Sequence, residues 1–133
     1  MGYSKRILFV CVENAGRSQM AEGFLRKYAP HLEVSSAGTK PRSQLIPNVV
    51  EAMKEIGIDI TKQKPKDLTN EMISQSITVN MGCMDKESCP ALFIDNVIDW
   101  NISDPKNKDI EQIREIRDEI KNQVLKLIKK LEE

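Results

Sequence analysis

The chain has 133 residues, no formal net charge, 40% hydrophobic residues and 5% aromatic residues. These values favour one globular domain over residues 1–133 that buries a sizeable core, and they speak against nucleic-acid or membrane-surface binding. No apolar run is long enough to span a membrane or to form a signal-peptide core. Three cysteines are too few for a secreted disulfide scaffold, so we expect a reducing, cytoplasmic setting in which cysteines are catalytic or redox-active.

The predicted elements alternate between strands and helices along the chain. Strands are expected at residues 5–10, 32–37, 77–81 and 97–102. Helices are expected at residues 18–28, 48–56, 67–75 and 108–132, the last with a long aliphatic stripe on a charged helix. This alternation predicts a three-layer α/β fold, with a four-stranded parallel sheet covered by helices on both faces.

The segment from Cys11 to Ser18 joins the first predicted strand to the first helix. Free amides at a helix start attract anions, and together with the helix dipole they favour the thiolate form of Cys11. The planar guanidinium of Arg17 can hold two oxygens of a tetrahedral oxyanion. Ser18 can cap the helix and also donate its hydroxyl to the thiolate. The predicted oxyanion-binding loop comprises Val12, Glu13, Asn14, Ala15, Gly16 and Arg17.

Two further reactive side chains follow predicted strands. Cys83 comes directly after the third strand, and Asp104 follows the fourth. Ligands of parallel sheets bind outside the carboxyl ends of the strands, so we expect Cys11, Cys83 and Asp104 to share one site. The only histidine, His31, follows a proline in a loop and is expected at the surface. A closed zinc site made from it and the two later cysteines, Cys83 and Cys89, would lack a fourth ligand.

The motif from Cys11 to Gly23, with residues 36–38 and the Asp104–Pro105 pair, resembles the low-molecular-weight tyrosine phosphatase superfamily, over nearly the whole chain. Within it the chain is more similar to the thioredoxin-coupled arsenate reductases. Three features favour that branch: the continuation Arg17–Gly23, the absence of tyrosines after Asp104–Pro105, and the later cysteine pair, Cys83 and Cys89.

The resemblance implies a three-thiol relay. Cys11 would attack arsenate, Cys83 would attack the Cys11 sulfur and expel arsenite, and Cys89 would move the disulfide to Cys83–Cys89. Asp104 would protonate the departing oxygen. Six residues of regular helix would hold the two later cysteines roughly 10 Å apart, whereas a disulfide needs about 4.4–6.8 Å between Cα atoms. We therefore expect the segment 83–90 to be a loop, or to unwind on oxidation.

The resemblance also bears on cofactors and partners. Some of these reductases bind potassium near the loop, and Asn14, Glu22 and Ser36 match that site, but Lys66 stands where an acidic ligand belongs. We therefore expect no metal, or a weakened site with the lysine ammonium in place of the ion. No tightly bound cofactor is expected. The expected partners are arsenate or a phosphate-like oxyanion and a thiol reductant such as thioredoxin, acting on a monomer.

Two other functions remain open from the sequence. A tyrosine or small-phosphoester phosphatase would use Cys11, Arg17 and Asp104 alone and let water cleave the cysteinyl phosphate. A redox-sensing, oxyanion-binding module would form disulfides without turning over either substrate. The reductase is the interpretation that uses all three cysteines.

Overall fold

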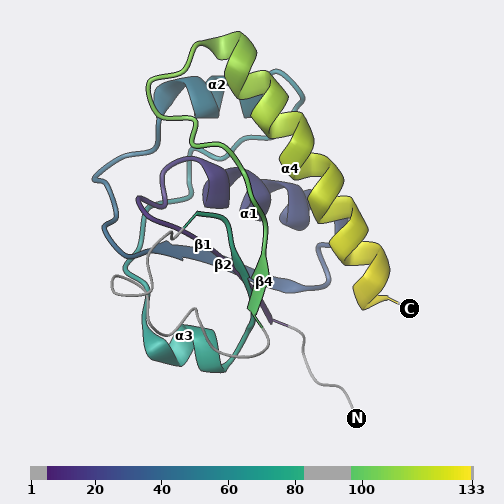
Figure 1. Cartoon of the computed structure of the whole chain (residues 1–133). Helices are drawn as coiled ribbons and strands as arrows, with labels where there is room; N and C mark the ends of the chain where they lie inside the picture. Colours follow the sequence, from purple (N-terminus) through teal and green to yellow (C-terminus); the bar gives the residue numbers. More distant parts are fainter. Residues whose placement is uncertain (1–5, 83–96, 133) are drawn as a thin grey trace.

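The computed structural model describes residues 6–82 and 97–132 (Figure 1). Four parallel strands form one sheet in the order β2-β1-β3-β4, with β1 at Arg6–Cys11, β2 at Glu33–Gly38, β3 at Ile77–Asn80 and β4 at Val97–Asp99. The helices are α1 at Arg17–Tyr28, α2 at Pro47–Lys54, α3 at Asn70–Ser74 and α4 at Ile110–Leu131. The predicted four-stranded parallel α/β architecture is confirmed.

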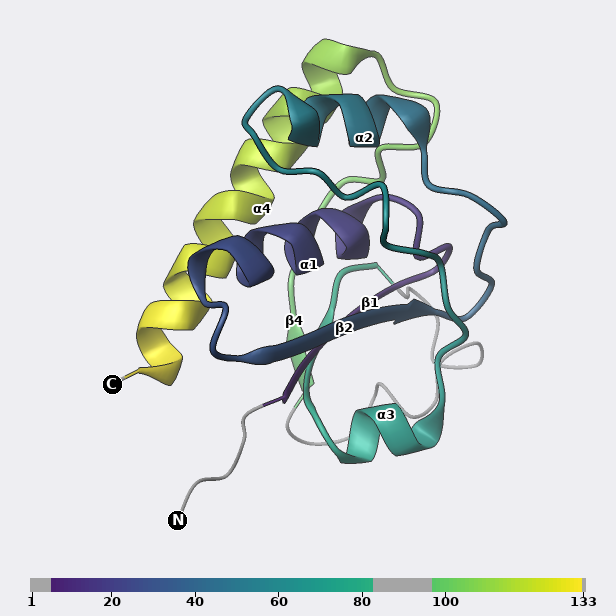
Figure 2. The same ribbon diagram turned by 180° about the vertical axis from the view of Figure 1, so that it is seen from behind.

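The helices cover both faces of the sheet. Views from opposite sides place α1, α2 and α4 over one face and α3 over the other (Figures 1 and 2). Successive residues of β1 divide between two hydrophobic clusters, because side chains alternate along a strand. Phe9 and Cys11 belong to the larger cluster under α1 and α4, whereas Leu8 and Val10 pack with Ile73 of α3. Cys11 therefore leaves the sheet on the α1 side.

The ends of two predicted helices are set by local capping. Asp109 accepts a 2.8 Å hydrogen bond from the amide of Gln112, whose side chain accepts from the Asp109 amide, so α4 begins at residue 110 rather than 108. Thr69 accepts from the amide of Met72, so α3 begins at residue 70 rather than 67. The fourth strand ends at Asp99, three residues earlier than expected.

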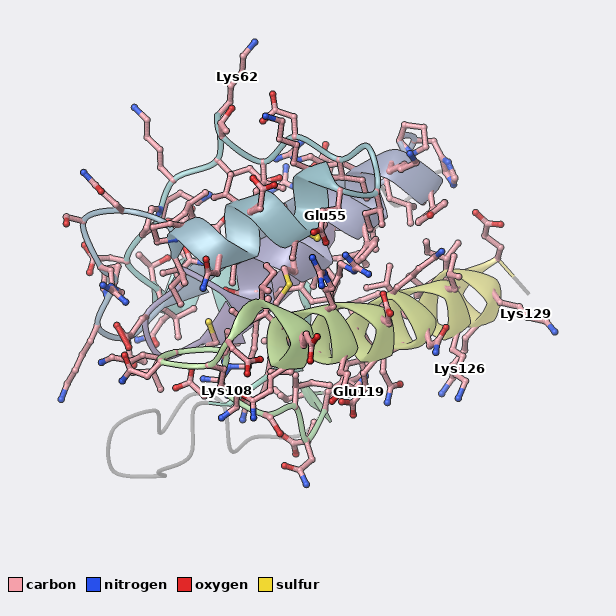
Figure 3. The ribbon with its side chains drawn as sticks, turned by 90° about the horizontal axis from the view of Figure 1, so that it is seen from above. Glu55, Lys62, Lys108, Glu119, Lys126 and Lys129 are labelled. Atoms are coloured by element: carbon pink, nitrogen blue, oxygen red, sulfur yellow. The ribbon has the colours of Figure 1, made fainter. Side chains whose placement is uncertain are left out.

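An ion-pair cluster ties α2 to α4. The Glu55 carboxylate accepts from Arg114 at 2.6 Å and from Arg117 at 3.1 Å. Figure 3 shows Glu55 between α2 and α4. The hydrogen bond from Arg114 is the main cause that lowers the pKa of Glu55. Arg117 also donates to the carbonyl of Ala52, so its buried guanidinium joins the helices through both charge and backbone.

Two further predictions concern the exposure of His31 and the presence of membrane-spanning helices. His31 is exposed, as predicted, and its Nε2 lies 3.0 Å from a carboxylate oxygen of Glu132. Among the helices that the structure describes, none has the length and apolar character needed to cross a bilayer.

Candidate active site

The carbonyl groups of the loop between β1 and α1 are bonded to neighbouring parts of the chain. The carbonyls of residues 12, 13 and 15 accept bonds of 2.9–3.0 Å from amides of the connection 40–46, and the carbonyl of Asn14 accepts from the Gln19 side chain at 2.9 Å. Within the described part of the chain, the amides of residues 13–17 bond to no acceptor. Consecutive unbonded amides at a helix start form a site suited to an anion.

Asn14 holds the loop in shape. Its backbone φ of 49° lies in the left-handed region, which asparagine tolerates better than most residues. Its buried side chain donates to the Ser18 hydroxyl at 2.7 Å and accepts from the amide of Lys66 at 2.8 Å. The side chain thus links the loop to α1 and to the segment that precedes α3.

Ser18 contacts the sulfur rather than the helix backbone. Its Oγ lies 2.9 Å from the Cys11 Sγ, and both groups are buried. Because Asn14 donates to this oxygen, the hydroxyl proton is available to the sulfur. The expectation that Ser18 also caps α1 is wrong: the helix begins one residue earlier, its N-cap is Gly16, and no side chain caps it. The Ser18 oxygen accepts from the Asn14 side chain rather than from a helix amide, and the hydroxyl faces the thiol.

Arg17 is the first residue of α1, and its side chain is buried. Its Nη1 donates to the carbonyl of Ile102 at 3.2 Å. A Cβ atom at Gly82 would lie 1.9 Å from the same nitrogen, and Gly82 has a φ of 142°. The guanidinium is therefore seated against a position that only glycine can occupy.

Asp104 lies at the mouth of the site. Its Oδ2 is 3.8 Å from an Arg17 nitrogen, its Oδ1 accepts from the amide of Lys106 at 3.0 Å, and about half of the side chain is exposed. Cys11, Arg17 and Asp104 line one small pocket, together with Gly16 and Pro105 among others. A nucleophile, an oxyanion-binding cation and a candidate proton donor thus converge at the carboxyl edge of the sheet.

A carboxylate also lines this anion pocket. Glu13 projects from the oxyanion loop and is held by two cations, with Lys106 Nζ at 3.2 Å and Arg42 Nε at 3.5 Å. Arg42 and Lys106 come from two connections that are distant in sequence, and sequence reasoning assigned neither of them to the site. Their charges compensate the negative charge that Glu13 brings to the pocket.

The residues that match a potassium site already have protein partners. The buried Glu22 carboxylate accepts from Ser36 at 2.6 Å and from Arg26 at 2.9 Å. The side-chain oxygen of Asn14 accepts from the backbone of Lys66. The cation beside Glu22 is therefore the Arg26 guanidinium rather than a lysine ammonium. Each of these side chains therefore has a hydrogen-bond partner within the protein.

Cys83 and Cys89 lie outside the described residues, as does the segment 83–90 in which we expected a loop. Of the three side chains predicted to meet at the sheet edge, the structure brings Cys11 and Asp104 together. The described strand that precedes Cys83, β3, pairs with β1 in register, with Val10 opposite Asn80.

A family model described as low molecular weight phosphotyrosine protein phosphatase matches residues 6–133. A putative arsenate reductase of Halobacterium salinarum is 40% identical over 126 residues, covering 90% of this chain and 87% of the relative. An arsenate reductase of Staphylococcus aureus is 38% identical, covering 88% and 91%. The solved thioredoxin-dependent arsenate reductase of Corynebacterium glutamicum is 37% identical with a TM-score of 0.80, covering 96% of this chain but 62% of that one.

Proposed function

We propose that this chain, which belongs to the low-molecular-weight phosphotyrosine protein phosphatase family, is an arsenate reductase whose nucleophile is Cys11. The arsenate reductase assignment is carried by the similarity to the two arsenate reductases, and the assignment of Cys11 as nucleophile by the Cys11–Ser18 contact of 2.9 Å beside the unbonded loop amides. A thiolate stabilised in this way can attack the central atom of an oxyanion that the amides and Arg17 hold.

In the first step the Cys11 sulfur forms a bond to arsenic, and an arsenate oxygen departs as water. Asp104 supplies a proton to that oxygen, consistent with its place at the pocket mouth beside Arg17. Arg17 and the loop amides balance the negative charge that develops on the remaining oxygens. Arsenic is still in the pentavalent state in this adduct.

Reduction requires a second thiolate, which we assign to Cys83. It attacks the Cys11 sulfur, the sulfur–arsenic electron pair passes to arsenic, and trivalent arsenite leaves. The resulting Cys11–Cys83 disulfide is attacked by the Cys89 thiolate, which frees Cys11 and leaves a Cys83–Cys89 disulfide. A thiol reductant of the thioredoxin type then returns both sulfurs to thiols. Because turnover needs reduced cysteines, we place the protein in the cytoplasm.

The test is a single turnover of fully reduced protein with arsenate, followed by mass mapping of its disulfides. The proposal expects about one arsenite per chain and a Cys83–Cys89 bridge. Cys89→Ser should instead accumulate a Cys11–Cys83 bridge, and Cys11→Ser should release no arsenite. Disulfides without arsenite would contradict the reductase and favour the redox-sensing module.

A phosphatase remains the second candidate, because Cys11, Arg17 and Asp104 line the same pocket. These groups suffice to form a cysteinyl phosphate that water hydrolyses. Hydrolysis of an aryl phosphate that depends on Cys11, in the absence of any arsenite release, would replace the reductase with this function.

A further inference from the structure

We propose that Glu13 is a specificity-determining residue that restricts the active site to small inorganic oxyanions and excludes phosphoesters with bulky leaving groups. This inference rests on the proposed function and names its substrate class. It starts from an unexpected feature, a carboxylate on the wall of an anion pocket, where its charge alone would weaken substrate binding.

The position of Glu13 is fixed from two sides. Lys106 Nζ and Arg42 Nε lie 3.2 Å and 3.5 Å from its two carboxylate oxygens, and the amide of Arg42 donates to the Glu13 carbonyl at 3.0 Å. Each partly exposed pair is worth little alone. Together with the backbone bond, however, they hold one side chain between the oxyanion loop, the connection that contains Arg42 and the loop that contains Lys106.

A second groove adjoins the site on the far side of these ion pairs. It has a volume of about 320 Å³, and its walls include both cations that hold Glu13 as well as Lys108, which precedes α4 (Figure 3). Ile46 and Pro105 line both this groove and the active-site pocket. The two spaces therefore share a wall, and the Glu13 ion pairs stand at their boundary.

The candidate proton donor for a phosphoester leaving group is linked to this boundary through Lys106. In an in-line displacement the leaving atom departs on the side opposite the attacking sulfur, where a proton donor must reach it. Asp104 is the candidate donor, and Lys106, two residues later, is bonded through its amide to Asp104 and through its ammonium to Glu13. An aryl or peptidyl group would have to displace that ion pair to enter the groove. The oxygen lost from arsenate needs no such space.

The test compares two ligands that cannot be hydrolysed, inorganic phosphate and phenylphosphonate. Their dissociation constants are measured from the protection of Cys11 against alkylation by iodoacetamide, a readout that requires no turnover. In the wild-type chain phenylphosphonate should bind at least about tenfold more weakly than phosphate. In Glu13→Gly the ratio of the phenylphosphonate dissociation constant to the phosphate dissociation constant should fall by about tenfold or more. The boundary opens in this variant, and Arg42 and Lys106 are released into the groove.

Lys106→Ala provides a second variant with an unaltered oxyanion loop, and its ratio should shift in the same direction. Lys40→Ala is the matched control: its side chain is exposed and lies outside the ion pairs around Glu13, so its ratio should stay within about twofold of wild type. Equal binding of both ligands by the wild-type chain would overturn the proposal, as would an unchanged ratio in the folded Glu13 and Lys106 variants. Neither result depends on arsenite release, which tests the proposed function separately.

Discussion

The Ser18 hydroxyl offers the sharpest test of how this chain activates its thiol. Ser18→Ala removes the group that lies 2.9 Å from the Cys11 sulfur, and with it the oxygen that accepts the hydrogen bond of the Asn14 side chain. Ser18 is completely buried, so bulk water does not replace the lost donor. Hydrogen bonds to charged groups contribute about 1.5–3 kcal/mol. If loss of this hydrogen bond raises the barrier to attack by the sulfur by that amount, the rate of attack falls by roughly ten- to a hundredfold.

The assay is the rate of Cys11 alkylation by iodoacetamide at pH 7, read by mass spectrometry at the peptide that contains residue 11. We expect the Ser18→Ala rate to fall by at least about tenfold, and Ser18→Thr, which keeps a hydroxyl, to recover part of it. Ser74→Ala, which removes an exposed serine hydroxyl of α3, should match the wild type. A Ser18→Ala rate within twofold of wild type, in protein with a native melting curve, would refute the assignment of Ser18 as the thiolate donor.

Three other perturbations test separate parts of the structure. Gly82→Ala should weaken phosphate binding by at least about tenfold in titration calorimetry, because its Cβ would collide with Arg17. Gly57 also has a positive φ, but only the Lys27 ammonium lies near its Cβ position. Gly57→Ala should therefore lower the melting temperature without changing the affinity for phosphate. Asp104→Asn should reduce the single-turnover rate of arsenite release by about 10²–10⁴-fold, the usual contribution of a positioned proton donor. Glu55→Gln should lower the melting temperature at pH 7. The pKa of Glu55 in the folded state lies below its ordinary value of 4.5. The difference in melting temperature between wild type and Glu55→Gln should therefore be largest at pH values above 4.5, and it should vanish as the pH falls through the folded-state pKa.

The sheet and the nucleophile loop could be predicted because their signals are local. An uninterrupted apolar strand, a cysteine at its end and an amphipathic helix after it fix the β1–loop–α1 unit within some twenty residues. The shared edge of a parallel sheet then brings Asp104 to Cys11. The error at Ser18 has the same local origin. A serine near a helix start predicts a cap, and only the folded position of the sulfur shows that the hydroxyl has another partner.

The partners of the two acidic residues near the site could not be predicted in this way. Glu13 is paired with Arg42 and Lys106, which lie about 30 and 90 residues further along the chain. Their meeting depends on the path of two irregular connections, and these carry no periodic signal. Glu22 pairs with Arg26 one helical turn away, a spacing that is visible in the sequence. The resemblance to a potassium site instead predicted Lys66 as the cation at this position.

The unbonded amides of the oxyanion loop have a consequence for how this fold can diversify. Because main-chain amides bind the anion, most loop side chains are not needed to recognise it. Their identities can change while the backbone site is retained. The residues that cannot vary freely are those that fix the backbone, above all Asn14, which carries the left-handed turn. Chemistry around the bound oxyanion can therefore be altered by exchanging side chains on its rim, such as Glu13, without rebuilding the part that binds.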